Sequence, residues 1–380
     1  MKKKRKKEEQ NLQQRSLRVI ISGGGTGGHI FPAIAIANAL KEMNPSSEFL
    51  FVGAEGRMEM EKVPAAGYKI TGLSISGIQR SLSLKNLLLP FKVINSVFRS
   101  RQIIREFRPD VAIGVGGYAS GPLLFAATSM KIPALIQEQN SFAGVTNKIL
   151  SKRVQKICVA YDGMEKYFPK EKIVLTGNPV RENMVDISGK REEAMKFFEL
   201  RSDRKTVLVI GGSLGARTIN ESIGNGLKEF AGKDIQLIWQ TGKGFFQNAR
   251  GLAMGYSGAG IRIYDFIQRM DLAFAAADVV VSRAGASSVS ELSLVGKPSI
   301  LVPSPNVAED HQTKNAMALV NAGAAILVKD QEAYHNLQKE TMALINDSDR
   351  KAKLSANISR MALKNSARVI AEEVYKLIKN

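Results

Sequence analysis

The chain alternates between short apolar runs and longer segments in which apolar residues recur every three to four positions. Runs such as Val19–Ile21 and Val207–Ile210 are continuous rather than alternating, which is typical of parallel strands covered on both faces. The segments that follow them are rich in alanine or amphipathic, which predicts helices. This succession of strands and helices favours an α/β architecture with doubly wound parallel sheets.

The same plan occurs twice along the chain. An apolar strand, a glycine-rich turn and a helix that we place over residues 32–41 come first, and a second such unit begins at Thr206. We therefore expect a basic extension over residues 1–16, followed by Rossmann-like domains over 17–178 and 179–348. A C-terminal helix over 349–380 could return to the first domain. Strands are predicted at 18–21, 48–52, 111–115, 133–137, 157–160, 173–176, 206–210, 236–240, 261–264, 278–282 and 299–302.

Composition narrows the class of protein. The 380 residues are 44% hydrophobic, enough for two cores and too much for wholesale disorder. No run of eighteen apolar residues predicts a membrane-spanning helix. The single cysteine, Cys158, excludes a disulfide scaffold and a cysteine-based zinc cluster, and its apolar neighbours predict a buried side chain. The formal net charge of +19 indicates an anionic partner.

The positive charge is concentrated in two segments. Residues 1–15 contain seven basic and two acidic side chains and almost no apolar ones, which predicts disorder and, without an apolar h-region, no secretory signal. Residues 78–110 have the same charge balance, but there the basic side chains interleave with apolar ones. This second segment could be a helix that packs on its own sheet, or a surface for an anionic bilayer. The apolar excess in Leu87–Phe91 favours the bilayer, and no recognisable nucleic-acid module is present.

Glycine clusters follow several predicted strands. Glycines at a strand-to-helix turn allow a phosphate group to approach the backbone N–H groups at the helix start. Gly23, Gly25 and Gly28 satisfy the spacing of a dinucleotide fingerprint, but no acidic residue ends the next strand, as that fingerprint requires. A further cluster over residues 114–122 lies at the same sheet edge. Gly211, Gly212 and Gly215 form a third cluster, after a predicted strand of the second half. Three glycine clusters at strand ends favour ligand binding over packing alone.

Polar residues near the helix starts allow structural and functional interpretations. Ser288 and Glu291 have the spacing of a capping box, which locally is the favoured interpretation. They could instead serve a diphosphate and a ribose at a helix start. His29 follows the first glycine turn, where it is either a structural residue or a general base. Residues 347–349 predict an N-cap rather than a metal site, and no metal is indicated.

Seven motifs occur in a fixed order along the chain: Gly24–His29, Gly116–Tyr118, Gln137–Asn140, Gly177–Arg181, Gly211–Arg217, Ser282–Glu291 and Asp310–Gln312. As an ordered set they resemble the MurG family of N-acetylglucosaminyltransferases, which make lipid II for peptidoglycan. The resemblance covers residues 17–375. It implies a role in cell wall biogenesis, cell shape and cell division.

The resemblance implies a GT-B fold, in which two Rossmann-like domains bind the donor UDP-GlcNAc without a cofactor. Ser213 and the helix start at 286–290 would then contact the diphosphate, Glu291 the ribose, and the backbone of Ile267 the uracil. The full donor pocket, carried over by motif, would comprise Thr26, Gly27, Gly28, Asn140, Arg181, Ser213, Ile267, Ala286, Ser287, Ser288, Val289, Ser290, Glu291 and Gln312.

The resemblance also implies the acceptor, the C4 hydroxyl of MurNAc in undecaprenyl-diphosphate-MurNAc-pentapeptide (lipid I), and inversion of the anomeric centre. Asn140 and Gln312 would hold the transferred sugar, and segment 82–101 would contact the cytoplasmic face of the bacterial plasma membrane. The acceptor diphosphate would lie at Gly116, Gly117 and Tyr118.

The resemblance leaves two candidates for the general base, His29 and then Glu138. The alternative functions are another nucleotide-sugar GT-B transferase, a nicotinamide oxidoreductase, and a non-enzymatic nucleic-acid or membrane tether that acts through residues 1–15. The missing strand-end acid argues against the oxidoreductase.

Overall fold

A computed structural model describes residues 16–75, 89–180, 184–212 and 215–378. It divides into two compact units. Unit 1 comprises the chain up to Val180 together with Asn365–Asn380, and unit 2 comprises Arg181–Lys364. The predicted basic extension, most of the loop before the basic helix, Arg181 and Ser213 lie outside the described residues.

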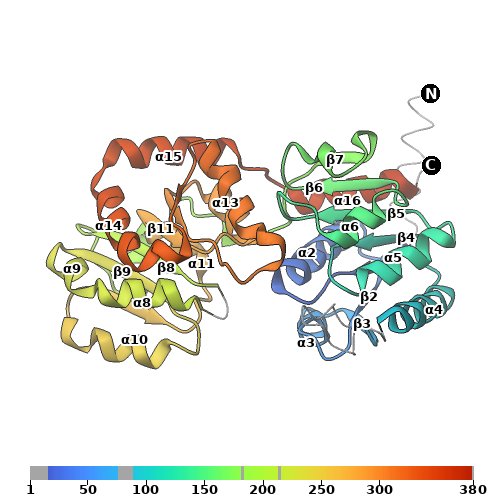
Figure 1. Ribbon diagram of the computed structural model, residues 1–380, viewed down its shortest axis with the longest axis horizontal. Helices are drawn as coiled ribbons and strands as arrows, with labels where there is room; N and C mark the ends of the chain where they lie inside the picture. Colours follow the sequence, from blue (N-terminus) through green and yellow to red (C-terminus); the bar gives the residue numbers. More distant parts are fainter. Residues whose placement is uncertain (1–15, 76–88, 181–183, 213–214, 379–380) are drawn as a thin grey trace. The chain divides into compact units, whose positions relative to one another are not determined.

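Unit 1 is built on one parallel sheet of seven strands in the order β3-β2-β1-β4-β5-β6-β7 (Figure 1). The order reverses beside β1, which places the loops after β1 and β4 next to each other at the carboxyl edge. Its strands are β1 (Arg18–Ser22), β2 (Glu48–Ala54), β3 (Lys69–Leu73), β4 (Val111–Gly114), β5 (Ala134–Glu138), β6 (Lys156–Val159) and β7 (Ile173–Leu175). Its helices are α2 (Gly27–Met43), α3 (Glu59–Ala65), α4 (Leu89–Phe107), α5 (Ser120–Ser129), α6 (Val145–Leu150) and α16 (Ser366–Ile378).

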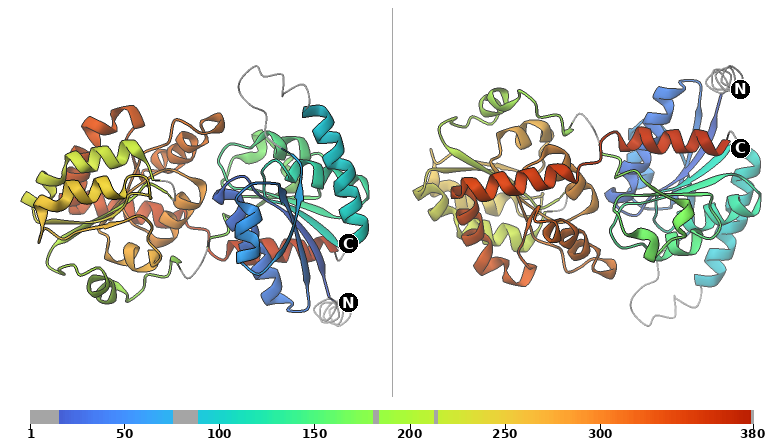
Figure 2. Two further views of the ribbon diagram at one scale, coloured as in Figure 1. Left: turned by 90° about the horizontal axis from the view of Figure 1, so that it is seen from below. Right: turned by 90° about the horizontal axis from the view of Figure 1, so that it is seen from above.

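Both faces of this sheet are covered, which explains the continuous apolar runs. Val19 and Ile21 join a buried cluster with residues of α2 and α16, whereas Ile20 between them joins a cluster with residues of α4 and α5. Helix α16, drawn in red, lies beside α2 (Figure 2). Because successive side chains of a strand point to opposite faces, a strand covered on both faces must be apolar at every position.

Unit 2 has a parallel six-stranded sheet in the order β10-β9-β8-β11-β12-β13. Together the two sheets confirm the predicted doubly wound α/β class. The strands are β8 (Lys205–Ile210), β9 (Ile235–Gln240), β10 (Ile261–Tyr264), β11 (Val279–Ser282), β12 (Ser299–Leu301) and β13 (Ile326–Leu327). The helices are α7 (Arg191–Phe197), α8 (Arg217–Asn225), α9 (Leu227–Gly232), α10 (Phe246–Ala253), α11 (Met270–Ala276), α12 (Ala286–Val295), α13 (His311–Asn321), α14 (Ala333–Asn346) and α15 (Ser348–Arg360).

The C-terminal segment differs from the single helix predicted over 349–380. It forms two helices, α15 in unit 2 and α16 in unit 1. Between them Asn365 has a φ of 57°, a left-handed conformation that a right-handed helix cannot contain. The apolar residues of α16, such as Val374, are buried in the core of unit 1. The last helix therefore belongs to the first unit although it follows the second in sequence.

Candidate functional site

The glycine turns after β1 and β4 contact each other at the carboxyl edge of unit 1. The N–H of Gly24 donates to the carbonyl oxygen of Gly116 over 3.3 Å. A Cβ on Gly117, whose φ is +90°, would lie only 2.4 Å from the Gly24 oxygen. Close contact between the two turns therefore requires glycine here. Tyr118, the next residue, is exposed beside this contact.

Helix α2 begins at Gly27, inside the glycine turn and five residues before the predicted start at Pro32. Proline is favoured in the first turn of a helix, but the glycine turn already has helical geometry. Thr26 is consequently the N-cap residue. The early start makes Gly27, Gly28 and His29 the first three helical residues, so the backbone N–H groups of this segment lie where anions bind.

The imidazole of His29 is oriented by the backbone of the same turn. Its Nδ1 lies 3.0 Å from the carbonyl oxygen of Gly24 and 3.4 Å from the hydroxyl of Thr26. A carbonyl oxygen only accepts hydrogen bonds, so Nδ1 carries the proton and Nε2 is the basic nitrogen of the neutral ring. The Cδ2–Nε2 edge of the ring lies beside Gly116, where a Cβ would lie 2.8 and 2.9 Å from these two atoms. The arrangement gives His29 the tautomer that a general base needs.

Glu59 at the start of α3 is a buried acid that the sequence analysis missed. Its carboxylate accepts from the N–H of Gly25 over 2.8 Å and from that of Ala54 over 3.0 Å. A Cβ on Gly24 would lie within 2.2 Å of the same carboxylate. An internal anion thus already occupies the N–H of Gly25 and fixes the first glycine turn. An acid in the first turn of a short helix is common, so its sequence gave no signal of this contact.

Glu138, the second candidate base, is buried at the end of β5 and fully engaged. Its two oxygens accept from the backbone and side-chain nitrogens of Asn140, over 3.1 and 3.3 Å, and from the N–H of Gly144 over 3.0 Å. A fourth bond comes from Asn147 over 2.8 Å. Four donors match the capacity of a carboxylate. The geometry therefore favours a role for Glu138 in orienting Asn140, and favours His29 as the base.

Buried amides connect the turns of unit 1. Gln139 donates to the carbonyl oxygen of Val115 over 2.7 Å. Asn178 donates to the carbonyl oxygen of Gln139 over 2.9 Å and accepts from Gln137 over 2.9 Å. The turn after β4, the turn after β5 and the segment after β7 are thus held together. Gln137, Gln139 and Asn178, which belong to the sequence motifs, therefore hold the backbone of the site in place.

In unit 2 the helix start after β11 differs from the predicted capping box. Gly285 is the N-cap residue and Ser288 is the third residue of α12, without a side-chain cap at this end. The glycine has an extended backbone with a ψ of 149°, so a small residue ends the strand-to-helix turn. Val289 makes the first bond of the helix backbone, to Gly285 over 2.9 Å. The segment from Ala286 to Ser288 therefore presents the initial N–H groups of the helix, and Glu291 lies one turn further along.

Two more candidate residues have their polar groups engaged in loop contacts. Ile267 is buried, and its N–H donates to the side-chain oxygen of Gln240 over 3.0 Å. Gln240, which the sequence analysis missed, also donates to the carbonyl oxygen of Gly212 over 3.1 Å. Gln312 near the start of α13 accepts from the N–H of Ser304 over 2.9 Å. Each of these contacts fixes the backbone of a loop in which the sequence motifs place donor-binding residues.

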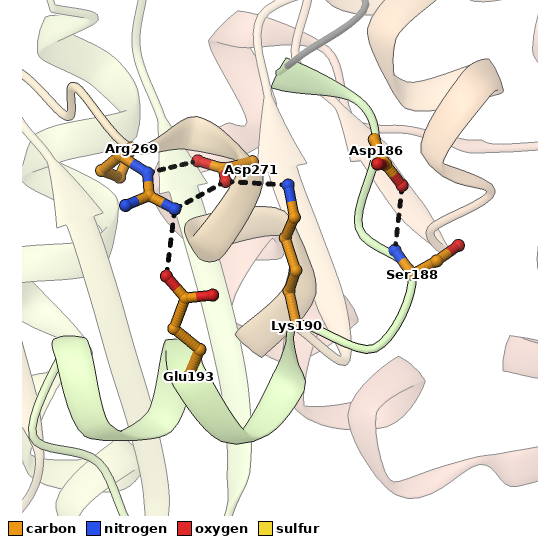
Figure 3. Close-up of polar contacts among 6 residues, drawn as sticks. All are labelled: Asp186, Ser188, Lys190, Glu193, Arg269 and Asp271. Atoms are coloured by element: carbon orange, nitrogen blue, oxygen red, sulfur yellow. Dashed lines mark hydrogen bonds and ion pairs between the residues drawn. The ribbon is translucent and has the colours of Figure 1, made fainter.

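An ion-pair network fixes the helix that follows Ile267 (Figure 3). Arg269 donates two bonds of 2.9 Å to Asp271 and one of 3.2 Å to Glu193 of α7. Lys190 donates to Asp271 over 3.1 Å. The Arg269 guanidinium, together with Lys190, holds the pKa of the Asp271 carboxyl well below its usual range. The Asp271 carboxylate therefore remains ionised at neutral pH, and the network anchors the start of α11 to α7.

The described residues contain no group of three or more His, Cys, Asp or Glu side chains that could hold a metal ion. The predicted N-cap at Asp347 is confirmed, since its side chain accepts from the N–H of Arg350 over 2.8 Å. None of the helices in this described part is long and apolar enough to cross a bilayer.

Comparison with known proteins identifies the family. Residues 19–159 match the N-terminal domain of glycosyltransferase family 28, and residues 206–374 match its C-terminal domain. A UDP-N-acetylglucosamine--N-acetylmuramyl-(pentapeptide) pyrophosphoryl-undecaprenol N-acetylglucosamine transferase of Parabacteroides distasonis is 56% identical over 96% of this chain and 99% of its own. The transferase of the same name from Christiangramia forsetii is 54% identical over 97% and 99% of the two chains.

The fold agrees with this assignment. The crystal structure of Acinetobacter baumannii MurG matches with a TM-score of 0.79 and 26% identity, over 95% of this chain and 99% of that one. The two parallel-sheet domains are those of the GT-B fold, as the sequence motifs predicted, and the oxidoreductase alternative is wrong. The chain therefore belongs to glycosyltransferase family 28, in the group of UDP-N-acetylglucosamine--N-acetylmuramyl-(pentapeptide) pyrophosphoryl-undecaprenol N-acetylglucosamine transferases.

Proposed function

We propose that this glycosyltransferase binds UDP-GlcNAc mainly on unit 2, at the start of α12, and lipid I on unit 1, at the glycine turns after β1 and β4. The proposal gives each unit one diphosphate-bearing ligand of the lipid II-forming reaction. Its main support is the pair of helix starts, α2 and α12, each of which follows a glycine-containing turn at the carboxyl edge of a parallel sheet. Ligands of such sheets bind at that edge.

The donor would lie along the loops of unit 2. The N–H groups at Ala286–Ser288 would bind the diphosphate, because a helix start carries a partial positive charge. The carboxylate of Glu291 would accept hydrogen bonds from the two ribose hydroxyls. The N–H of Ile267 donates to the side chain of Gln240. A uracil could therefore donate to the Ile267 carbonyl oxygen directly, but it could accept from the N–H only if the bond to Gln240 were broken. Gln312 would contact the GlcNAc.

Unit 1 would bind the acceptor, lipid I, and would supply the general base. The diphosphate of lipid I would lie at Gly116, Gly117 and Tyr118, and Asn140 would contact the transferred sugar. His29 would take the proton from the C4 hydroxyl of MurNAc through Nε2 as that oxygen attacks the anomeric carbon of GlcNAc. The bond to UDP breaks on the opposite face, so the anomeric centre is inverted. Negative charge on the departing UDP would be stabilised by the start of α12.

The donor part of this proposal predicts selective thermal protection. UDP-GlcNAc at 100 times its Kd should stabilise the protein by about 2.7 kcal/mol, because it binds the folded state alone. UDP-glucose, which lacks the N-acetyl group, should protect far less at the same concentration. Differential scanning fluorimetry with both sugars measures this directly. Equal protection by the two nucleotide sugars would contradict the predicted recognition of GlcNAc, and no protection by either would contradict donor binding.

Helix α4 supports the membrane part of the proposal, because it has two apolar surfaces. Ile103 and Ile104 are buried in the core of unit 1, so the helix does pack on its own sheet. Its earlier turns expose Ile94 and Phe98, which are 54% and 62% accessible, next to exposed basic side chains such as Arg99. An amphipathic basic helix is typical of proteins on anionic bilayers. We therefore place the enzyme peripherally on the cytoplasmic face of the plasma membrane.

This surface predicts a measurable loss of bilayer affinity. Replacing Ile94 and Phe98 together with serine should weaken binding to vesicles of anionic phospholipid by roughly tenfold or more, because each large apolar side chain contributes about 1.5–3 kcal/mol when buried. Cosedimentation with the vesicles gives the partition coefficient. Phe197→Ser is the matched control, since Phe197 is an exposed phenylalanine of unit 2. Unchanged binding of the double variant would contradict the assigned membrane surface.

A further inference from the structure

Three loops at the carboxyl edge of unit 2 carry or adjoin the proposed donor residues. They follow β11, β12 and β13, which are neighbours in the sheet. The first leads into α12, where we place the diphosphate and the ribose, and the second leads to α13 and Gln312. Arg283 is the residue between the end of β11 and the turn that caps α12. From this position the side chain could contact either the diphosphate or the neighbouring loops.

The side chain of Arg283 contacts protein groups from two other loops. Its Nη1 donates to the carbonyl oxygens of Val302 and Pro303, over 3.0 and 3.1 Å, in the loop after β12. The same nitrogen forms an ion pair with Asp330, in the loop after β13. The side chains of the pair are only 14% and 15% exposed. Asp330 in turn accepts from the hydroxyl of Thr218 in α8 over 3.0 Å.

Further contacts join the same part of unit 2 without involving the side chain of Arg283. Asn315 of α13 is fully buried, and its amide lies 3.4 Å from the carbonyl oxygen of Ala284, the residue after Arg283. Ser304, just beyond the two carbonyls that Arg283 contacts, donates to Gln312. The turn before α12 is thus joined to the loop after β12 and to helix α13, which contains Gln312. The distance between the diphosphate site and the sugar site depends on these contacts.

We propose that Arg283 and Asp330 are positioning residues that set the spacing between the start of α12 and the loop that leads to Gln312 at the start of α13. This inference rests on the donor site proposed above. The guanidinium faces carbonyl oxygens and a carboxylate, so the pair acts on the backbone of the donor loops. Arginine suits this task because its guanidinium stays charged, and here its Nη1 contacts both carbonyl oxygens and the carboxylate. The sugar of the donor, which must reach from one loop to the other, is the part of the ligand that depends on the pair.

The experiment compares two ligands that differ only in the sugar. Isothermal titration with UDP-GlcNAc and with UDP gives the affinity that the GlcNAc adds, and steady-state kinetics give KM for each substrate and kcat. Arg283→Met and Asp330→Asn each remove the ion pair. We expect kcat/KM for UDP-GlcNAc to fall by about 100-fold, the effect of a misplacement near 1 Å. The GlcNAc contribution should fall with it, whereas UDP loses less affinity and KM for lipid I is unchanged.

Arg262→Met is the matched control. Arg262 also donates to two carbonyl oxygens, those of Phe198 and Glu199, over 2.8 and 2.6 Å, and pairs with the Glu199 carboxylate. It lies on β10 of the same unit, at the opposite edge of the sheet from β13. Its loss should reduce stability but leave the ratio of the UDP-GlcNAc and UDP affinities unchanged. The ratio therefore separates positioning of the donor from general support of the fold.

The outcomes distinguish this inference from the donor site itself. If Arg283→Met does not fold, Arg283→Lys keeps the charge on a shorter side chain, and the same ratio is measured. Folded Arg283 or Asp330 variants that keep the wild-type ratio of the two affinities would overturn the positioning role and leave the donor site intact. Absence of UDP-GlcNAc binding by the wild-type protein would overturn the donor site and this inference with it.

Discussion

Replacing His29 with asparagine should lower kcat by about 10² to 10⁴-fold, the usual contribution of a positioned general base. The asparagine amide nitrogen can occupy the place of Nδ1 and donate to the carbonyl oxygen of Gly24, which His29 contacts over 3.0 Å. The turn is therefore preserved while the basic nitrogen is removed. The C4 hydroxyl would then attack without a partner for its proton. Single-turnover kinetics with saturating UDP-GlcNAc and lipid I measure the chemical step.

The affinity for UDP-GlcNAc should stay near the wild-type value in His29→Asn, because the base acts on the acceptor hydroxyl. His335→Asn provides the control, since His335 lies on α14 and contacts the ring of Tyr334. It should leave kcat unchanged. A His29→Asn protein that retains wild-type turnover would exclude His29 as the base. Glu138 would then be the next candidate, although four hydrogen-bond donors already contact its carboxylate.

The second large effect is expected for the ribose contact. Glu291→Ala should weaken UDP binding by about 100-fold or more, because each hydrogen bond to a charged acceptor contributes about 1.5–3 kcal/mol and the ribose offers two hydroxyls. Glu291 lies one turn into α12, behind the N–H groups proposed for the diphosphate. Isothermal titration with UDP measures the change.

A modified ligand makes this test specific. The 2′,3′-dideoxy form of UDP lacks both hydroxyls, so Glu291→Ala and the wild-type protein should bind it equally. Glu340→Ala, on α14 of the same unit, should not change the affinity for either nucleotide. If Glu291→Ala weakened both nucleotides by the same factor, the glutamate would support the helix rather than the ribose, and the assignment would be wrong.

The fold was predictable wherever a strand is covered on both faces. Runs such as Val207–Ile210 have to be apolar at every position, and that pattern is visible in the sequence. Of the four strands at the sheet edges, β7 and β10 were predicted, whereas β3 and β13 were missed. β3 mixes lysine, threonine and glycine with apolar residues, and β13 has only two residues. The break at Asn365 was missed because the residues on both sides of it favour helix and only the backbone conformation ends the helix.

The candidate site was predictable at its glycine turns and less so beneath them. Glycine is required where the backbone has a positive φ or makes a close contact, as at Gly117, and such glycines at strand ends are visible in the sequence. Glu59, Gln240 and Arg283 fix those loops through contacts with residues far away in the sequence. The spacing of neighbouring residues in the sequence does not indicate contacts of this kind. The capping box at Ser288 was wrong for the opposite reason, since a local motif was present but Gly285 capped the helix three residues earlier.

A crystal structure of the protein with UDP tests the central claim most directly. We expect the two phosphates to accept hydrogen bonds from backbone N–H groups between Ala286 and Ser288, with both ribose hydroxyls on the carboxylate of Glu291. Density for the nucleotide at the glycine turn of Gly23–Gly28 instead, with the start of α12 unoccupied, would contradict the account.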